Sequence, residues 1–150
     1  MMPYLASDCP TGYPDIDRQH DRIFEQLEVA TRAAHADDLA GTKRALQELG
    51  DAIMAHFAGE ESLMAATAYP DRVRHKSAHD LFMQDFVQLT RELDSTGLCA
   101  PTLLWISARV PEWIKFHIRV NDEPLGRHLA RAPRPAPGGR PARPVKTGAS

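Results

Sequence analysis

The chain has 150 residues, with 20 acidic and 18 basic side chains that give a formal net charge of −2. This length fits one ordinary domain, and a hydrophobic content of 43% excludes a wholly disordered chain. The near-neutral charge excludes a strong basic field, so no specific nucleic-acid partner is expected. The 12 prolines and 7 histidines are many for this length, and both are unevenly distributed.

The N-terminal segment contains neither a basic region nor an apolar run of signal-peptide length, and no later apolar stretch is long enough to span a membrane. Cys9 and Cys99 can form at most one disulfide, and without an export signal two free thiols in a reducing compartment are favoured. We therefore expect a cytoplasmic protein that makes no membrane contact, with no functional role for either cysteine.

Apolar residues at intervals of three and four predict four helices between residues 15 and 123. The expected helices cover about residues 17–36, 46–64, 70–93 and 101–120. Short connections separate them, and no alternating pattern typical of a strand competes. We therefore predict an all-α fold, an antiparallel up-down-up-down four-helix bundle over residues 1–130 with an N-terminal arm.

Two prolines are expected to disturb the fourth helix. Pro111 lies inside the pattern, where it removes one backbone hydrogen bond and clashes with the carbonyl of Ser107, which should bend the helix. Pro124 is expected to help end the helix, because it disfavours helical geometry at Glu123.

The last segment, residues 131–150, differs from the rest in composition. It holds five prolines and five basic residues but no acid, so it carries a charge of +5 beside −7 for the rest of the chain. It has almost no large apolar side chain and cannot form a core, so we expect a disordered tail. Two roles are open for this tail: it keeps the protein soluble, or it tethers an acidic or proline-recognising partner.

Polar residues interrupt the apolar stripes of the helices at six positions. These are His20, His56, Glu60, His75, His79 and His117. Burying an uncompensated carboxylate or imidazole costs several kcal/mol, from a net stability of about 5–15 kcal/mol for a whole domain. A bound metal is the compensation that the spacing favours, because two polar pairs, His56 with Glu60 and His75 with His79, are each four residues apart and share a helical face.

A further carboxylate, Asp122, follows His117 by five residues. In an ideal helix this offset is about 140°, so Asp122 reaches the same site only if the last turn loosens, which Pro124 favours. Five imidazoles and two carboxylates are too many ligands for one tetrahedral zinc and too rich in nitrogen for calcium or magnesium. Two six-coordinate transition-metal ions, bridged by the carboxylates and a solvent oxygen, fit better. One coordination position then stays open for a small molecule.

Four short strings carry a family resemblance. They are Asp17-Arg18-Gln19-His20, His56-Phe57-Ala58-Gly59-Glu60-Glu61, Tyr69-Pro70 before His75-x-x-x-His79, and Trp113-x-x-x-His117-Ile118 with Asp122. Over about residues 12–122 the chain resembles the hemerythrins, in particular the single-domain bacteriohemerythrins. The resemblance implies a centre of two non-haem iron ions, with an oxo or hydroxo bridge, that binds dioxygen reversibly inside a four-helix bundle.

The resemblance also implies a role for each polar residue of the stripes. One iron is held by His75, His79 and His117, the other by His20 and His56, and both by Glu60 and Asp122. Dioxygen would enter at the open position of the two-histidine iron. Five apolar residues are expected to wall the dioxygen pocket and to keep out water and protons: Ile23, Phe57, Trp113, Ile114 and Ile118. Their other role is bundle core, and both roles can hold together.

The leading hypothesis is that the protein stores, delivers or buffers dioxygen and is not an enzyme. One alternative is a di-iron enzyme that acts on peroxide or nitric oxide. Another is an oxygen or redox sensor or adaptor in which oxygenation changes how the tail engages a partner. Histidine-rich ligation brings fewer negative charges than the carboxylate-rich di-iron sites of ferritin-like proteins, which favours reversible binding over high-valent oxidation.

Overall fold

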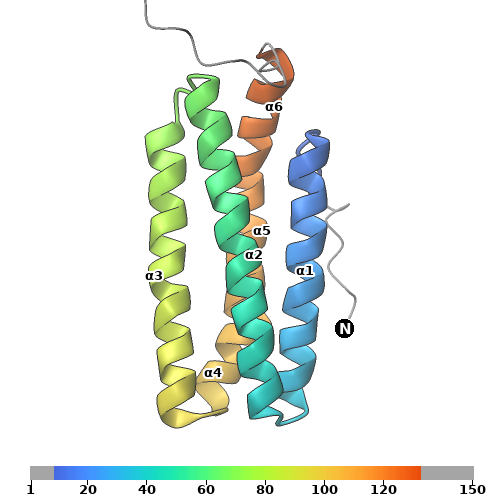
Figure 1. The fold of residues 1–150 in the computed structure, drawn as a ribbon, viewed down its shortest axis with the longest axis vertical. Helices are drawn as coiled ribbons and strands as arrows, with labels where there is room; N and C mark the ends of the chain where they lie inside the picture. Colours follow the sequence, from blue (N-terminus) through green and yellow to red (C-terminus); the bar gives the residue numbers. More distant parts are fainter. Residues whose placement is uncertain (1–8, 133–150) are drawn as a thin grey trace, which may run out of the picture.

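The computed structural model describes residues 9–132, and every regular element in this part is helical. Three long helices, α1 (Pro14–His35), α2 (Leu39–Ala66) and α3 (Arg72–Thr96), alternate in direction with a fourth column of short segments (Figure 1). The column consists of α4 (Ala100–Leu104), the π-helix η2 (Trp105–Arg109), α5 (Val110–His117), the π-helix η3 (Ile118–Asp122) and α6 (Glu123–Arg131). The predicted all-α, up-down-up-down four-helix bundle is confirmed.

The segment expected to form a tail, residues 131–150, lies outside the described residues except for its first two. Its role and its partner therefore stay predictions. No helix within residues 9–132 is long and apolar enough to cross a lipid bilayer.

Local residue chemistry places the ends of the long helices. Pro14 suits the first turn of α1, where a backbone N–H would have no partner within the helix. Asp38 caps α2, because its side chain accepts a hydrogen bond from the backbone N–H of Gly41 at 2.9 Å. Helix α3 ends at Thr96 and is followed by the C-cap residue Gly97, whose φ of 70° is adopted at low cost by glycine.

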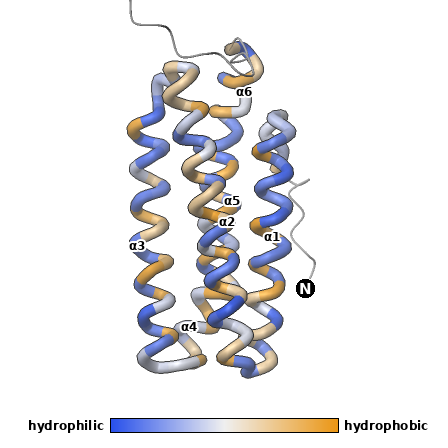
Figure 2. The backbone as a smooth tube through the Cα atoms, viewed as in Figure 1, coloured by the Kyte–Doolittle hydropathy of each residue, from blue (hydrophilic) through white to orange (hydrophobic). Residues whose placement is uncertain are grey.

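Two apolar clusters fill the bundle at different levels. The larger cluster includes Leu46, Leu49, Phe86, Leu89 and Ile106. The smaller cluster forms where α6 meets α1 and α2, and it consists of Ile16, Met64, Tyr69, Leu125 and Leu129. Figure 2 shows apolar and hydrophilic stretches alternating along each helix, as one-sided burial requires. In sequence, His20 of α1 falls between Ile16 of the smaller cluster and Ile23 of the larger one, and Glu60 of α2 falls between Phe57 and Met64 in the same way. These buried polar residues therefore mark a polar layer where the two clusters meet.

The two later prolines of the fourth column each follow a π-helix. Pro111 comes after η2 and Pro124 after η3, and each lies in the first turn of the next α-helical segment. At η3 the backbone N–H of Glu123 donates to the carbonyl of Ile118, five residues back, and this wider turn leaves room for the proline ring. The prediction that Pro124 helps to end the helix is therefore wrong, because α6 continues to Arg131.

The start of the described chain forms an arm, residues 9–13, that packs against α6. Thr11 donates hydrogen bonds from its backbone N and its Oγ1 to Asp17 Oδ1, at 2.9 and 2.7 Å. The arm approaches Gly126 so closely that a Cβ there would lie 2.2 Å from the carbonyl oxygen of Thr11. Cys9 belongs to the larger core cluster, and Cys9 and Cys99 are both free thiols.

Gly126→Ala is expected to lower the free energy of unfolding by about 1–3 kcal/mol, because the added Cβ must displace backbone rather than a flexible side chain. Gly59→Ala is the matched control, since a Cβ at Gly59 meets nothing within 4 Å and should raise stability by about 0.5–1 kcal/mol. Urea unfolding followed by circular dichroism measures both variants. Equal stabilities would contradict the packing of the arm on α6.

Candidate metal centre

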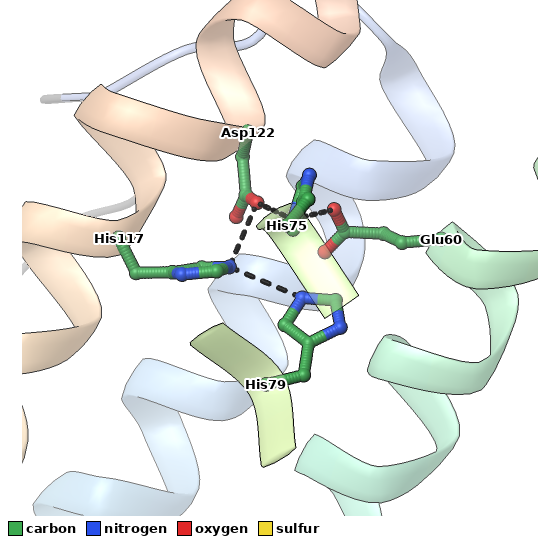
Figure 3. A group of neighbouring side chains, drawn as sticks. All are labelled: Glu60, His75, His79, His117 and Asp122. Atoms are coloured by element: carbon green, nitrogen blue, oxygen red, sulfur yellow. Dashed lines mark hydrogen bonds and ion pairs between the residues drawn. The ribbon is translucent and has the colours of Figure 1, made fainter. Parts of the chain in front are cut away.

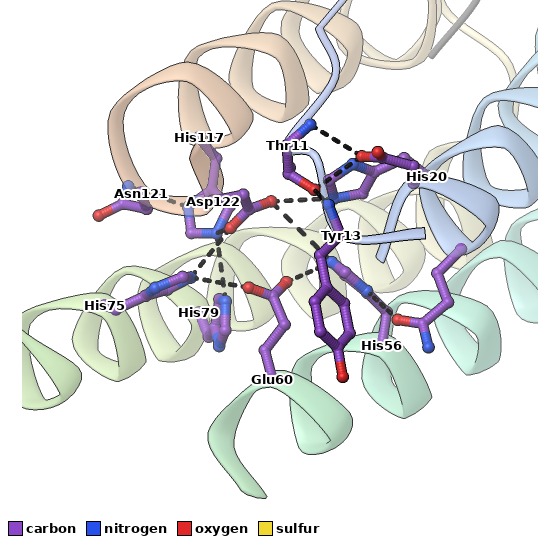
Figure 4. A network of polar contacts seen from close by, with 12 residues as sticks. Thr11, Tyr13, His20, His56, Glu60, His75, His79, His117, Asn121 and Asp122 are labelled. Carbon is purple, nitrogen blue, oxygen red and sulfur yellow. Dashed lines mark hydrogen bonds and ion pairs between the residues drawn. The ribbon is translucent and has the colours of Figure 1, made fainter. Parts of the chain in front are cut away.

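Seven buried polar side chains meet in the layer between the two apolar clusters. They are His20 from α1, His56 and Glu60 from α2, His75 and His79 from α3, His117 from α5 and Asp122 from η3. None of them is more than 4% exposed. The sequence predicts these same seven residues as metal ligands, and the structure brings all of them together (Figure 4). Figure 3 shows Glu60, His75, His79, His117 and Asp122 alone.

Helix geometry explains how residues distant in sequence reach one layer. The two pairs spaced by four residues lie one turn apart on the regular helices α2 and α3. Asp122 follows His117 by five residues, which a regular α-helix would place about 140° away. The π-helix η3 widens this turn, and Asp122 Oδ1 lies 3.1 Å from His117 Nε2. The loosening that the sequence requires for Asp122 is therefore present.

The imidazoles turn Nε2 inward, toward the two carboxylates. His20 Nε2 lies 2.9 Å from Asp122 Oδ2, and His56 Nε2 contacts Glu60 Oε1. His75 Nε2 lies between the carboxylates, 3.0 Å from Asp122 Oδ1 and 3.2 Å from Glu60 Oε2. Each carboxylate therefore contacts histidines from more than one helix.

The candidate ligand atoms divide into two overlapping groups, and within each group they all lie within 4.8 Å of one another. One group is Glu60, His75, His79, His117 and Asp122, and the other is His20, His56, Glu60 and Asp122. The two carboxylates belong to both groups, whereas three histidines belong to the first and two to the second. Two neighbouring metal ions bridged by carboxylates require such a division of ligands.

The side chains of this centre do not satisfy one another. Both Glu60 oxygens, His75 Nε2 and Asp122 Oδ1 are buried without a well-directed hydrogen bond. The Nε2 atoms of His79 and His117 face each other at 3.1 Å (Figure 3). Buried polar atoms without partners are costly, and metal cations bind the lone pairs of all these atoms. The residues present therefore fit a metal site.

Burial and charge shift the pKa values of the ligands in opposite directions. Burial lowers the pKa of His75, but its close contacts with the carboxylates of Asp122 and Glu60 outweigh burial and raise that pKa to about 9. Burial and the neighbouring imidazoles, His117 first, lower the pKa of His79 to about 2. Burial raises the pKa of Asp122, but the surrounding histidines hold it well below its usual value. At neutral pH the metal-free centre therefore holds a proton on His75, which a metal ion must displace.

A small apolar cavity adjoins the centre. Its volume is about 20 Å³, which is enough for one small molecule. The five residues that the sequence predicts as pocket walls all line it: Ile23, Phe57, Trp113, Ile114 and Ile118. Sequence reasoning missed Ile53 and Phe82, which also line the cavity, because their spacing indicates only a place in the core.

Two aromatic residues of the cavity wall lie flat against histidines of the centre. Phe57 stacks on His79 with ring centroids 3.7 Å apart, and Trp113 stacks on His117 at 4.6 Å. These contacts restrict rotation of the two imidazoles, so the wall also orients ligands.

Sequence reasoning missed two amide side chains behind the centre. Gln19 Oε1 lies 2.6 Å from His56 Nδ1, and Asn121 Nδ2 lies 3.2 Å from His117 Nδ1. Asn121 follows His117 by four residues, a spacing that could have indicated their contact. Gln19 and His56 belong to different helices, so no spacing in the sequence indicates that they are in contact.

The fold and the buried centre define a helical-bundle metal-binding protein. A family model described as "Hemerythrin HHE cation binding domain" matches residues 11–129. Bacteriohemerythrins of Pseudomonas paraeruginosa and Stenotrophomonas maltophilia are 30% identical over 115 and 116 residues, which are 77% of this chain and 73% and 74% of theirs. The chain therefore belongs to the hemerythrin family.

More distant relatives agree with this assignment. The myohemerythrin of Riftia pachyptila is 27% identical, over 80% of this chain and 88% of its own. A solved hemerythrin point mutant matches with a TM-score of 0.76 at 24% sequence identity, over 87% of this chain and 98% of that chain. This structural match supports the four-helix fold.

Proposed function

We propose that the protein binds dioxygen reversibly at a non-haem di-iron centre and so stores, delivers or buffers the gas. The observation that carries the proposal is a pair of shared carboxylates between a set of three histidines and a set of two. One iron ion would be held by His75, His79 and His117, the other by His20 and His56, and both by Glu60 and Asp122. When bound, two ferrous ions supply the electrons that dioxygen takes up on binding and returns on release.

The smaller histidine set marks the side on which dioxygen would bind. An ion held by two histidines has fewer protein ligands than one held by three, so its coordination shell has room for a further molecule. Both histidines of the smaller set, His20 and His56, line the apolar cavity. Of the larger set, only His117 lines it. The open position would therefore face the cavity.

The cavity wall favours binding over catalysis. Among the described residues, the titratable side chains that line the cavity are His20, His56, His117 and Asp122. All four are proposed iron ligands, so none is left in the wall to act as a general acid or base. The remaining lining is apolar and excludes water and protons, which slows oxidation of the centre. These features favour an oxygen-binding protein over an enzyme acting on peroxide or nitric oxide.

We also place the protein in the cytoplasm. Cys9 and Cys99 are free thiols, which suits a reducing compartment. A reducing compartment also returns ferric iron to the ferrous form that binds dioxygen.

Anaerobic reduction of the iron-loaded protein, followed by admission of air, tests the proposed function. We expect about two irons per chain and a visible charge-transfer band that appears with oxygen and disappears when oxygen is removed. The protein should turn over neither peroxide nor nitric oxide. An iron content far below two, or a spectrum that oxygen does not change, would refute the proposal.

A further inference from the structure

A groove between α1 and α2 reaches the outer side of one proposed ligand. Its volume is about 710 Å³, and its lining includes Gln19, Arg22, Gln26, Glu48 and His56. His56 itself is only 4% exposed, whereas Gln19 is exposed in the groove. The Gln19 side chain places its Oε1 atom 2.6 Å from His56 Nδ1. Gln19 therefore holds the outer nitrogen of a buried ligand on the side that solvent can approach.

The hydrogen bond between Gln19 and His56 specifies one tautomer of the imidazole. An amide oxygen can only accept, so Nδ1 of His56 carries the ring proton. Nε2 then presents its lone pair to the interior, where it contacts the Glu60 carboxylate. We propose that Gln19 is a positioning residue for the two-histidine metal site, because it fixes both the tautomer and the ring orientation of His56. The inference rests on the proposed function, since it requires His56 to bind a metal ion.

The effect of Gln19 should be confined to one of the two metal positions. The other histidine of the smaller set, His20, has no hydrogen bond at Nδ1. In the larger set it is Asn121 that contacts an outer nitrogen, that of His117. Within residues 9–132, Gln19 is thus the side chain that fixes the outer face of the two-histidine set. Loss of Gln19 should weaken the binding of the metal ion at that set and leave the binding of the other ion unchanged.

Zinc(II) titration against a chromophoric chelator tests this inference with a metal that has no redox chemistry. In Gln19→Leu we expect the dissociation constant of the weaker zinc site to rise about 10–100-fold, with the tighter site unchanged. Gln19→Glu keeps an acceptor and should bind both ions within about threefold of the wild type. Gln26→Leu is the matched control, because it makes the same change in the same groove. It should leave both zinc sites unchanged, since the hydrogen bond to His56 comes from Gln19.

Proton NMR of the zinc-loaded protein gives a second readout. The Nδ1 proton of His56 should exchange slowly in the wild type and give a resolved signal. It should exchange with water of the groove and lose that signal in Gln19→Leu, and regain it in Gln19→Glu. Wild-type zinc affinities in Gln19→Leu, or equal weakening in Gln26→Leu, would overturn the inference. Failure of the wild type to bind two zinc ions would instead overturn the proposed di-metal function, so the two failures are distinguishable.

Discussion

Asp122→Asn is expected to reduce bound iron from about two ions per chain to one or fewer and to abolish the oxygen-dependent absorption. Asp122 is fully buried and contacts histidines of both sets, with Oδ2 2.9 Å from His20 Nε2 and Oδ1 3.1 Å from His117 Nε2. An amide offers one neutral oxygen where the carboxylate offers two charged ones, so it cannot bridge two cations. Iron analysis and visible spectra recorded before and after admission of air measure the two effects.

Glu61→Gln is the matched control for this substitution. Glu61 directly follows the proposed ligand Glu60 but pairs with Lys76 near the surface, at 3.6 Å. Glu61→Gln removes the same charge as Asp122→Asn and should keep both iron ions. Circular dichroism of metal-free Asp122→Asn reports whether the bundle has folded. A folded variant with two irons and a wild-type oxygen response would show that Asp122 is not a bridging ligand.

The fold and the set of candidate ligands could be predicted because both depend on spacing along single helices. A stripe at intervals of three and four must face the interior, so polar residues on four such stripes converge in one layer. Glu60 and His79 need only a regular turn to join their partners, and α2 and α3 provide it. Asp122 needs a wider turn, which could be predicted only as a condition. The neighbouring Pro124 made that condition reasonable, and η3 meets it.

Other features could not be predicted because they depend on contacts between elements. Gln19 meets His56 across two helices, and the arm meets Gly126 across the bundle end, so neither contact leaves a periodic trace in the sequence. The predicted helix end at Pro124 was wrong for a different reason. Proline only biases the preceding residue away from α-helical dihedrals, and Glu123 keeps them, with φ −60° and ψ −47°, at the wider turn of η3.

At the cavity wall, Ile118→Thr is expected to speed the loss of bound dioxygen by oxidation of the iron centre. We expect the rate in Ile118→Thr to be about tenfold or more that in Ile118→Val. Ile118 is 1% exposed and lines the cavity beside the proposed ligands His20 and Asp122. Threonine and valine are nearly equal in size, so both variants enlarge the cavity by the same amount. Only threonine adds a hydroxyl, which holds water and its protons beside the centre. Decay of the oxygen-dependent band at fixed pH measures the rate.

The comparison with Ile118→Val separates the polarity of the wall from its volume. Ile118→Val should lower the free energy of unfolding by about 0.5–1.5 kcal/mol. Ile118→Thr should lower it somewhat more, and its hydroxyl can donate a hydrogen bond to a carbonyl one turn earlier in the helix. Both variants should keep two irons, because no proposed ligand is changed. Equal oxidation rates in the two variants would show that the space around the centre, rather than its dryness, determines how long bound dioxygen survives. A difference between them would assign that protection to the apolar wall.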